Sequence, residues 1–154
     1  MKKETADQLR WLNQEFYQNF SSSFSSTRQH IQPGARRLLG EMPARGNFLD
    51  IGCGNGNLAV EWQKSARQGL YQGIDFSGEL MEVAQEKVRT LTLSEGQAIC
   101  FTPADVNDQN WSCQLPRLDW QIVVLFAVLH HIPSMKRREQ LLRTIHGLLS
   151  EGGA

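Results

Sequence analysis

The stretch FLDIGCGNGN, from Phe48 to Asn57, is a short apolar run followed by glycines at alternate positions. Glycines spaced in this way after a strand let the backbone pass close to a bound ligand, because a Cβ atom there would fill the ligand's space. The stretch therefore predicts a strand, a ligand-binding turn, and a helix that begins after Asn55.

Strands and helices alternate on the C-terminal side of this turn. Apolar runs predict four strands, at residues 47–51, 70–75, 97–102 and 121–128. The last run is apolar on both faces, which is typical of a buried parallel strand. Ser77 and Ser134 are placed to act as N-caps of two intervening helices, and the apolar spacing of the second predicts that Leu142 is among its inward residues. This order predicts an α/β fold with a doubly wound, mostly parallel sheet.

The N-terminal part has a different character. Leu9, Leu12, Phe16 and Phe20 recur at helical spacing and predict an amphipathic helix over residues 5–20. A serine-rich segment, SSSFSSTR, follows and is interpreted as a loop or lid. Pro33 is suited to the first turn of a second helix, which we expect to stop before Pro43. We therefore divide the chain into N-terminal helices with a serine-rich lid, residues 1–45, and a core, residues 46–154.

The core is expected to stop after its fourth strand and the following helix. The segment LLSEGG, residues 148–153, has the composition of a turn into a fifth strand, and the sequence ends at Ala154. Its resemblance to the turn before a fifth strand in known folds implies a sheet that is truncated, with its C-terminal strands missing, in a chain that is either a fragment or genuinely short. In both cases we expect an open edge along the fourth strand. Such an edge favours self-association or pairing with a missing segment.

Composition excludes several classes of protein. Lys plus Arg and Asp plus Glu each total 16, so no global basic field attracts nucleic acid. The apolar run at residues 122–129 is far shorter than the roughly 20 residues of a membrane span. The cysteines, Cys53, Cys100 and Cys113, are odd in number and widely spaced, which indicates reduced thiols. We expect a cytoplasmic protein without a membrane anchor.

The residues after each strand indicate which ligand the turn takes. A dinucleotide fingerprint needs a third small residue where Asn57 stands, and Asp50 would repel a diphosphate. S-adenosylmethionine (SAM) fits better, since it carries an ammonium and a sulfonium group and no phosphate. Asp75 is placed to accept hydrogen bonds from the ribose hydroxyls and Asp105 from the adenine amino group, although either could be a simple cap or turn residue. The expected cofactor residues are Asp50, Gly52, Gly54, Gly56, Asp75, Phe76, Asp105, Val106 and Phe126.

The ordered motifs resemble those of class I SAM-dependent methyltransferases. These motifs are LDIGCGNGN, GIDFSGELMEVAQEK, ADVND, VVLFAVLHHIP and LLSEGG, from about Phe48 to the C-terminus. The resemblance implies a Rossmann-like fold, SAM as cofactor and methyl transfer as activity. In that family the fourth strand usually opens with an aromatic residue and an aspartate, whereas Gln121 follows Trp120 in this chain.

A second resemblance lies upstream of the core. FSSTRQHIQP, residues 24–33, is similar to the segment before the core of the tRNA wobble-uridine carboxymethyl methyltransferases, with Gln32 in place of their tryptophan. It implies tRNA modification, by methylation of the carboxymethyl group of a wobble uridine. A small-molecule methyltransferase and a SAM-binding module without turnover are the alternatives.

Methyl transfer is an in-line displacement, so positioning accounts for most of the catalysis. A carboxylate acceptor is already ionised at neutral pH and needs no general base, whereas an amine or phenol would need one, for which His131 is the candidate. Arg28 is the candidate clamp on the methionyl carboxylate or on substrate, unless it is a solvated surface charge. His130 and His131 are not expected to bind metal, because adjacent side chains point apart. If tRNA is the substrate, the candidate phosphate contacts are Arg36, Arg37, Lys136, Arg137 and Arg138.

Overall fold

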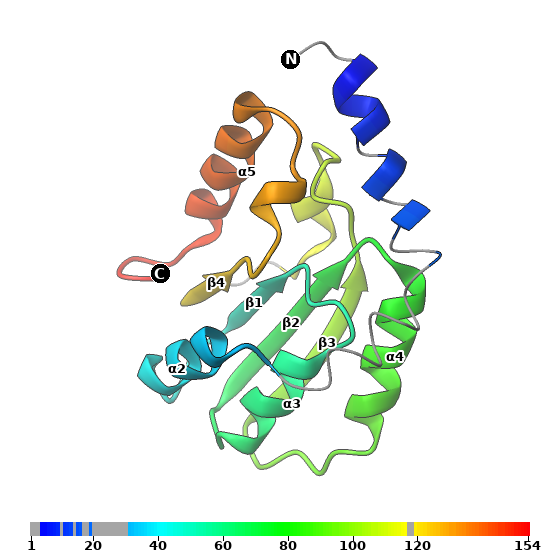
Figure 1. The fold of residues 1–154 in the computed structure, drawn as a ribbon. Coiled ribbons are helices and arrows are strands. Elements are labelled where there is room, and N and C mark those ends of the chain that lie inside the picture. Colours follow the sequence, from blue (N-terminus) through cyan, green and yellow to red (C-terminus); the bar gives the residue numbers. More distant parts are fainter. Residues whose placement is uncertain (1–3, 10, 14, 17–18, 20–30, 117–118) are drawn as a thin grey trace.

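A computed structural model of the chain describes residues 4–9, 11–13, 15–16, 19, 31–116 and 119–154 (Figure 1). Within them, four parallel strands form one sheet in the order β3-β2-β1-β4. Their bounds are β1 Phe48–Ile51, β2 Gly69–Asp75, β3 Gln97–Pro103 and β4 Ile122–Val124. The chain runs from β1 through β2 to β3 and then crosses to β4 on the other side of β1, so the sheet is doubly wound and parallel, as the sequence predicts.

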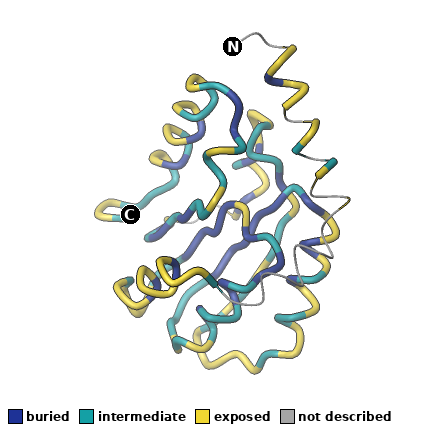
Figure 2. The backbone as a smooth tube through the Cα atoms, viewed as in Figure 1, coloured by how far each residue is buried: buried dark blue, intermediate teal, exposed yellow. Residues whose placement is uncertain are grey.

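Helices cover both faces of this sheet. Three of them, α2 Pro33–Glu41, α3 Asn57–Lys64 and α4 Gly78–Arg89, lie on one face, and α5 Met135–Leu148 lies on the other (Figure 1). Two short 3₁₀ helices, η1 Trp111–Gln114 and η2 Leu129–His131, follow β3 and β4. Between these layers β1 and most of β2 are buried, whereas β3 is partly exposed (Figure 2).

Side-chain alternation along β1 explains the two layers. Phe48 packs with Leu39 of α2 and Trp62 of α3. Leu49 and the residue two positions after it in β1 pack with Ile145 of α5. Successive residues of a strand point to opposite faces, so β1, β2 and β4 contribute to the core on both faces of the sheet, whereas β3 contributes only on the face covered by α2 and α3. This arrangement fixes the carboxyl ends of the strands along one edge of the molecule.

The local signals for helix ends are confirmed. Pro33 occupies the first turn of α2. Ser77 caps α4, with its hydroxyl oxygen accepting from the backbone N–H of Leu80 at 3.4 Å. Ser134 caps α5 in the same way, accepting from the N–H of Arg137 at 3.4 Å.

Apolar side chains are exposed on two helices, and for Leu142 this contradicts the prediction. The described residues between 4 and 19 are helical, but Leu9, Leu12 and Phe16 are exposed. Leu142, expected to point inward from α5, is 46% exposed, because Leu141 and Ile145 supply the buried face of that helix. Phe20 and most of the serine-rich segment lie outside the described residues.

The fourth strand is shorter than predicted. It ends at Val124, and the backbone at Ala127 has a φ of +57°. The residues after Val124 leave the sheet, and Val128 lies so close to the turn after β1 that a Cβ at Gly52 would overlap its side chain.

The outer edge of β4 is partly occupied by the chain's own C-terminal residues. Leu149 forms a parallel bridge with Trp120. The N–H of Ser150 donates to the Trp120 carbonyl at 2.9 Å, and the N–H of Val123 donates to the Ala154 carbonyl at 2.8 Å. The prediction of a fully open edge is corrected for these residues, and self-association stays a prediction. No helix in the described part of the chain combines the length and apolar character needed to cross a membrane.

Candidate functional site

The turn after β1 is built on left-handed backbone. Gly52, Gly54 and Gly56 have φ values of +75°, +53° and +75°, a region that side chains with a Cβ rarely adopt. A Cβ at Gly56 would lie 2.8 Å from the Cβ of Ala84 in α4, so this glycine also permits close packing of α3 on α4. The turn predicted from the sequence is therefore present, and its glycines serve the packing as well as the ligand space.

Asp75 joins the turn to the end of β2. One carboxylate oxygen accepts from the N–H of Gly54 at 3.0 Å, and the other accepts from the N–H of Ser77 at 2.9 Å. Burial, at 8% exposure, raises the pKa of Asp75, and the backbone donors lower it in part. Each oxygen has a second lone pair, so the carboxylate keeps capacity to accept bonds from a ligand.

Asp105 lies beside Asp75 at the end of the neighbouring strand. One of its carboxylate oxygens accepts from the backbone N–H of Asn107 at 2.8 Å and from the side-chain amide of Asn107 at 3.0 Å. Its charge contributes to the raised pKa of Asp75, so the two carboxylates lie close enough for their charges to interact. The fold thus brings together the two aspartates that sequence analysis assigned to the adenosine part of the cofactor.

Asp50 takes a different position from the other two acids. It is 3% exposed, and one of its carboxylate oxygens accepts a hydrogen bond from the hydroxyl of Tyr71 in β2. Burial is the main cause that raises the pKa of Asp50 to about 7, with the hydrogen bond from Tyr71 opposing it and the charge of Asp75 adding to it. Sequence analysis did not identify Tyr71 as part of this site.

Asn55 is a second residue that sequence analysis missed. It lies within the turn, is 5% exposed, and its side-chain amide nitrogen has no hydrogen-bond partner in the described structure. The backbone carbonyl oxygen of Asn55 accepts a hydrogen bond from the Lys87 ammonium at 3.0 Å. A buried unpaired donor is costly, so this amide is a sign of a ligand acceptor in the turn.

The remaining predicted site residues surround the turn less closely. Phe76 and Val106 are partly buried after β2 and β3, and Phe126 packs against the core on the α2 side. His131 is partly buried in η2, and its carbonyl accepts from the side-chain amide of Asn13 at 3.3 Å. Arg28 lies outside the described residues.

The two adjacent histidines do not point apart as predicted. The rings of His130 and His131 have centroids 3.9 Å apart and are tilted by 44°. The argument against metal binding from their direction is therefore wrong. In the described ranges, however, no group of three or more His, Cys, Asp or Glu residues is arranged to hold a metal ion.

The basic residues proposed for RNA contact do not form one surface. Arg36 and Arg37 lie on α2, where they pair with Glu61 at 3.5 Å and with Glu41 at 2.9 Å. The other three lie on α5, across the sheet, where Lys136 is exposed, Arg137 pairs with Asp7 at 3.1 Å, and Arg138 donates to the Ile132 carbonyl at 2.9 Å.

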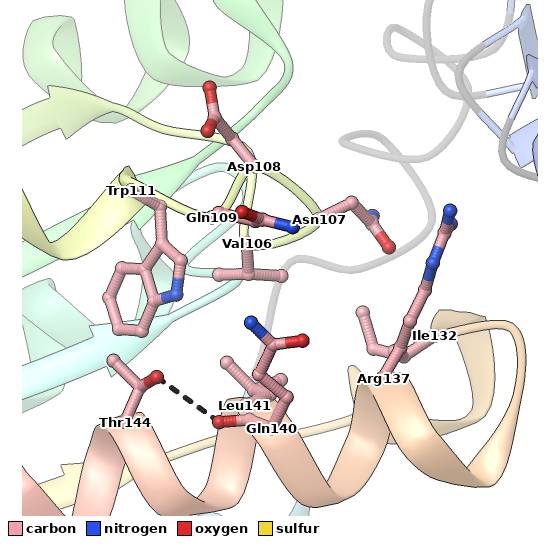
Figure 3. A pocket seen from close by; sticks show the side chains of 10 residues that line it. All are labelled: Val106, Asn107, Asp108, Gln109, Trp111, Ile132, Arg137, Gln140, Leu141 and Thr144. Atoms are coloured by element: carbon pink, nitrogen blue, oxygen red, sulfur yellow. Dashed lines mark hydrogen bonds between the residues drawn. The ribbon is translucent and has the colours of Figure 1, made fainter.

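A cavity of about 100 Å³ lies between the loop after β3 and helix α5 (Figure 3). Its lining includes Val106, Asn107 and Trp111 on one side and Arg137 and Gln140 on the other. The cavity shares Val106 with the predicted cofactor site but contains neither Asp75 nor the glycine turn. The strands and turns that hold the three aspartates therefore remain the candidate site.

Comparison with known proteins identifies the family. Residues 49–154 match the model of the methyltransferase domain family. The chain is 29% identical over 140 residues to mouse tRNA (carboxymethyluridine(34)-5-O)-methyltransferase ALKBH8, a match that covers 90% of the chain and 18% of the mouse protein. It is 31% identical over 121 residues to 27-O-demethylrifamycin SV methyltransferase of Amycolatopsis mediterranei, covering 76% of the chain and 40% of that protein.

One solved structure with the same fold contains the demethylated form of the cofactor. The N-methyltransferase NodS from Bradyrhizobium japonicum, in complex with S-adenosyl-L-homocysteine, matches with a TM-score of 0.59 and 17% identity over 76% of this chain and 54% of that one. The Rossmann-like class I methyltransferase fold, and SAM as the cofactor of the family, are thereby confirmed. The chain spans less than half the length of the two curated relatives described above.

Proposed function

The chain belongs to the methyltransferase domain family, and from this premise we propose that it transfers the methyl group of SAM to the carboxymethyl group of a tRNA wobble uridine. The observation that carries the cofactor part of this proposal is the hydrogen bond between the end of β2 and the turn after β1. Asp75 bonds to Gly54 of that turn, and the charge of Asp105 acts on Asp75.

The residues present fit the chemical groups of SAM. We assign the ribose hydroxyls to Asp75 and the adenine amino group to Asp105 with the backbone at Val106, while Phe76 and Phe126 supply apolar surface. The unpaired amide donor of Asn55 is suited to the cofactor's carboxylate, a group that Arg28 is also proposed to contact. The left-handed glycines Gly52, Gly54 and Gly56 keep Cβ atoms out of the space where the cofactor would lie.

The chemistry requires little of the protein beyond alignment. When bound, SAM supplies an electrophilic methyl group on its sulfonium. The protein then has to hold the acceptor oxygen about 3 to 3.5 Å from that carbon and in line with the breaking bond. A carboxylate acceptor is ionised at neutral pH, so His131, half-buried after β4, would serve to shape the acceptor side and not as a general base.

The substrate assignment is supported by a relative named for this reaction and by the upstream sequence segment. The mouse relative carries carboxymethyluridine methylation in its name, and FSSTR at residues 24–28 resembles the same family. We propose the basic residues of α2 and α5 as phosphate contacts. Because the two helices lie on opposite faces of the sheet, a bound tRNA would contact one group or the other at a time. The predicted cytoplasmic location suits a tRNA-modifying enzyme and stays a prediction.

A small-molecule acceptor is the second candidate. The Amycolatopsis relative, named for methylation of a rifamycin, is 31% identical and favours this alternative. A module that binds SAM without turnover is the third.

Methyl transfer from radiolabelled SAM separates these candidates. The chain is incubated with tRNA that contains 5-carboxymethyluridine, with the same tRNA bearing unmodified uridine at that position, and with a tRNA-free metabolite extract. We expect label only in the first sample, as a base-labile ester. Label confined to the extract would favour the second candidate, and saturable SAM binding without transfer to any sample would favour the third.

A further inference from the structure

The cavity between the loop after β3 and helix α5 is a ligand space that the glycine turn does not line (Figure 3). Val106 and Leu141 supply apolar surface, and the indole of Trp111, which is 2% exposed, forms a flat wall. Gln109 and Gln140 line the same space and are exposed, so the cavity reaches solvent on their side. This shape suits a planar group that enters edge first.

Two buried polar atoms of the lining residues have no hydrogen-bond partner in the described part of the chain. One is the side-chain oxygen Oδ1 of Asn107, an acceptor, and the other is Nη1 of Arg137, a charged donor. Figure 3 shows Arg137 extending from α5 toward the loop that carries Asn107. An unpaired buried donor and an unpaired buried acceptor are each costly, so the two together indicate a ligand that supplies both partners.

Other contacts fix the remaining atoms of these two side chains. The amide nitrogen of Asn107 donates to the Asp105 carboxylate at 3.0 Å. Because a carboxylate only accepts, the amide oxygen has to be the atom left for the cavity. Nη2 of Arg137 donates to Asp7 at 3.1 Å, and the backbone N–H of Arg137 donates to the N-cap hydroxyl of Ser134 at 3.4 Å. The acceptor and the donor are therefore held in place before a ligand binds.

The charges around the cavity favour a neutral ligand. The guanidinium of Arg137 is already paired with Asp7, and Arg137 is the single cationic residue of the described lining. Asp108, an exposed acid, borders the same space. A phosphate or carboxylate would be repelled by the two acids and would find one cation that is already neutralised. The group that fits is neutral and planar, with a hydrogen-bond donor beside an acceptor.

We propose that the cavity binds a pyrimidine base of the RNA substrate, with Asn107 accepting from the base N–H, Arg137 donating to its carbonyl oxygen and Trp111 contacting the ring. The bases of single-stranded RNA are recognised by such contacts to their edges and faces. The volume of about 100 Å³ is of the same order as the roughly 150 Å³ that holds one benzene ring, so a purine with two rings exceeds it. The RNA in this inference rests on the proposed function, and Arg137 contacts a base in place of a phosphate.

Nitrogen–proton NMR of the isotope-labelled chain measures binding of the base alone. Uridine is titrated into the chain saturated with S-adenosyl-L-homocysteine, and the indole N–H signal of Trp111 is followed after its assignment with Trp111→Phe. We expect a saturable shift with a dissociation constant in the millimolar range, and the same constant without S-adenosyl-L-homocysteine. N3-methyluridine, which lacks the imide N–H, should bind about tenfold more weakly or worse. Guanosine should cause no saturable shift.

Arg137→Lys tests the donor while keeping a charge that can pair with Asp7. Lysine lacks the second nitrogen of the guanidinium, so we expect uridine to bind about tenfold more weakly. With carboxymethyluridine-containing tRNA, the variant should have a raised KM and an unchanged kcat. Arg143→Lys, an exposed residue of the same helix, is the matched control and should change neither value. Thermal unfolding of both variants checks that they fold.

The outcomes separate this inference from the proposed function. Loss of uridine binding when S-adenosyl-L-homocysteine is present would place the base in the cofactor site and overturn the inference. Equal binding of N3-methyluridine would also overturn it, and so would an unmoved Trp111 signal, which would mean that the cavity holds ordered water only. Uridine binding as expected in a chain that methylates no tRNA would leave the pyrimidine site in place and overturn the proposed function. The comparison of ligands on the wild-type chain decides the point even if Arg137→Lys does not fold.

Discussion

Individual carboxylates in this chain have distinct roles that their positions after strands do not reveal. Asp75 ends β2 and Asp105 follows β3, and the two carboxylates lie close enough for their charges to interact. Asp50 is instead turned into the core toward Tyr71. Sequence position placed all three near the turn, but the direction of Asp50 depends on an aromatic cluster assembled from distant segments, which no local pattern encodes.

Replacing Asp75 tests the residue proposed to hold the ribose. We expect Asp75→Ala to weaken SAM binding by about 1.5 to 3 kcal/mol, because it removes a charged acceptor and leaves the N–H groups of Gly54 and Ser77 without a partner. Titration calorimetry gives the dissociation constant. Glu82→Ala, an exposed acid of α4, is the matched control. An unchanged dissociation constant for Asp75→Ala would show that this residue only organises the turn.

The raised pKa of Asp50 also leads to a prediction about the free energy of unfolding. Its folded pKa of about 7 lies above the unfolded value near 4, so the folded state binds more protons between these limits and loses stability as pH rises through this window. Asp50→Asn removes that cost. We expect the variant to be more stable than wild type by about 1 to 3 kcal/mol at pH 8 and by less at pH 5. Urea unfolding at the two pH values measures it, and a gain independent of pH contradicts the assignment.

At the scale of elements, helix ends were the most predictable features. Pro33, Ser77 and Ser134 act within one turn of their own positions, so the sequence contains the whole signal. The end of β4 was not predictable, because the apolar run continues past Val124 while the backbone leaves the sheet. The unpaired amide of Asn55 was missed for the same reason, since burial of a polar side chain is decided by the elements around it.

A pair of glycine substitutions tests the packing of α3 on α4. Gly56 combines a φ of +75° with a Cβ position 2.8 Å from Ala84, so we expect Gly56→Ala to destabilise the fold by about 1 to 3 kcal/mol. Gly40 lies within α2 with open space around it, and Gly40→Ala should be stabilising by about 0.5 to 1 kcal/mol. Thermal unfolding followed by circular dichroism measures both. Equal effects at the two positions would show that the turn adapts to a side chain.

At the scale of the whole molecule, the parallel sheet places every candidate cofactor group along one edge. The order β3-β2-β1-β4 sets β1 between β2 and β4, so the glycine turn faces both the aspartates after β2 and β3 and the residues after β4. This arrangement followed from the alternation of strands and helices in the sequence. The division of basic residues between two faces did not, because it depends on which side of the sheet each helix packs.

The most direct test of the central claim is a calorimetric titration of the chain with SAM, S-adenosyl-L-homocysteine and NAD. The turn lacks the third small residue of a dinucleotide site, and the aspartates around it favour a cationic ligand without phosphate. We therefore predict saturable binding of SAM and its demethylated product and much weaker binding of NAD. Tighter binding of NAD than of SAM would contradict the account.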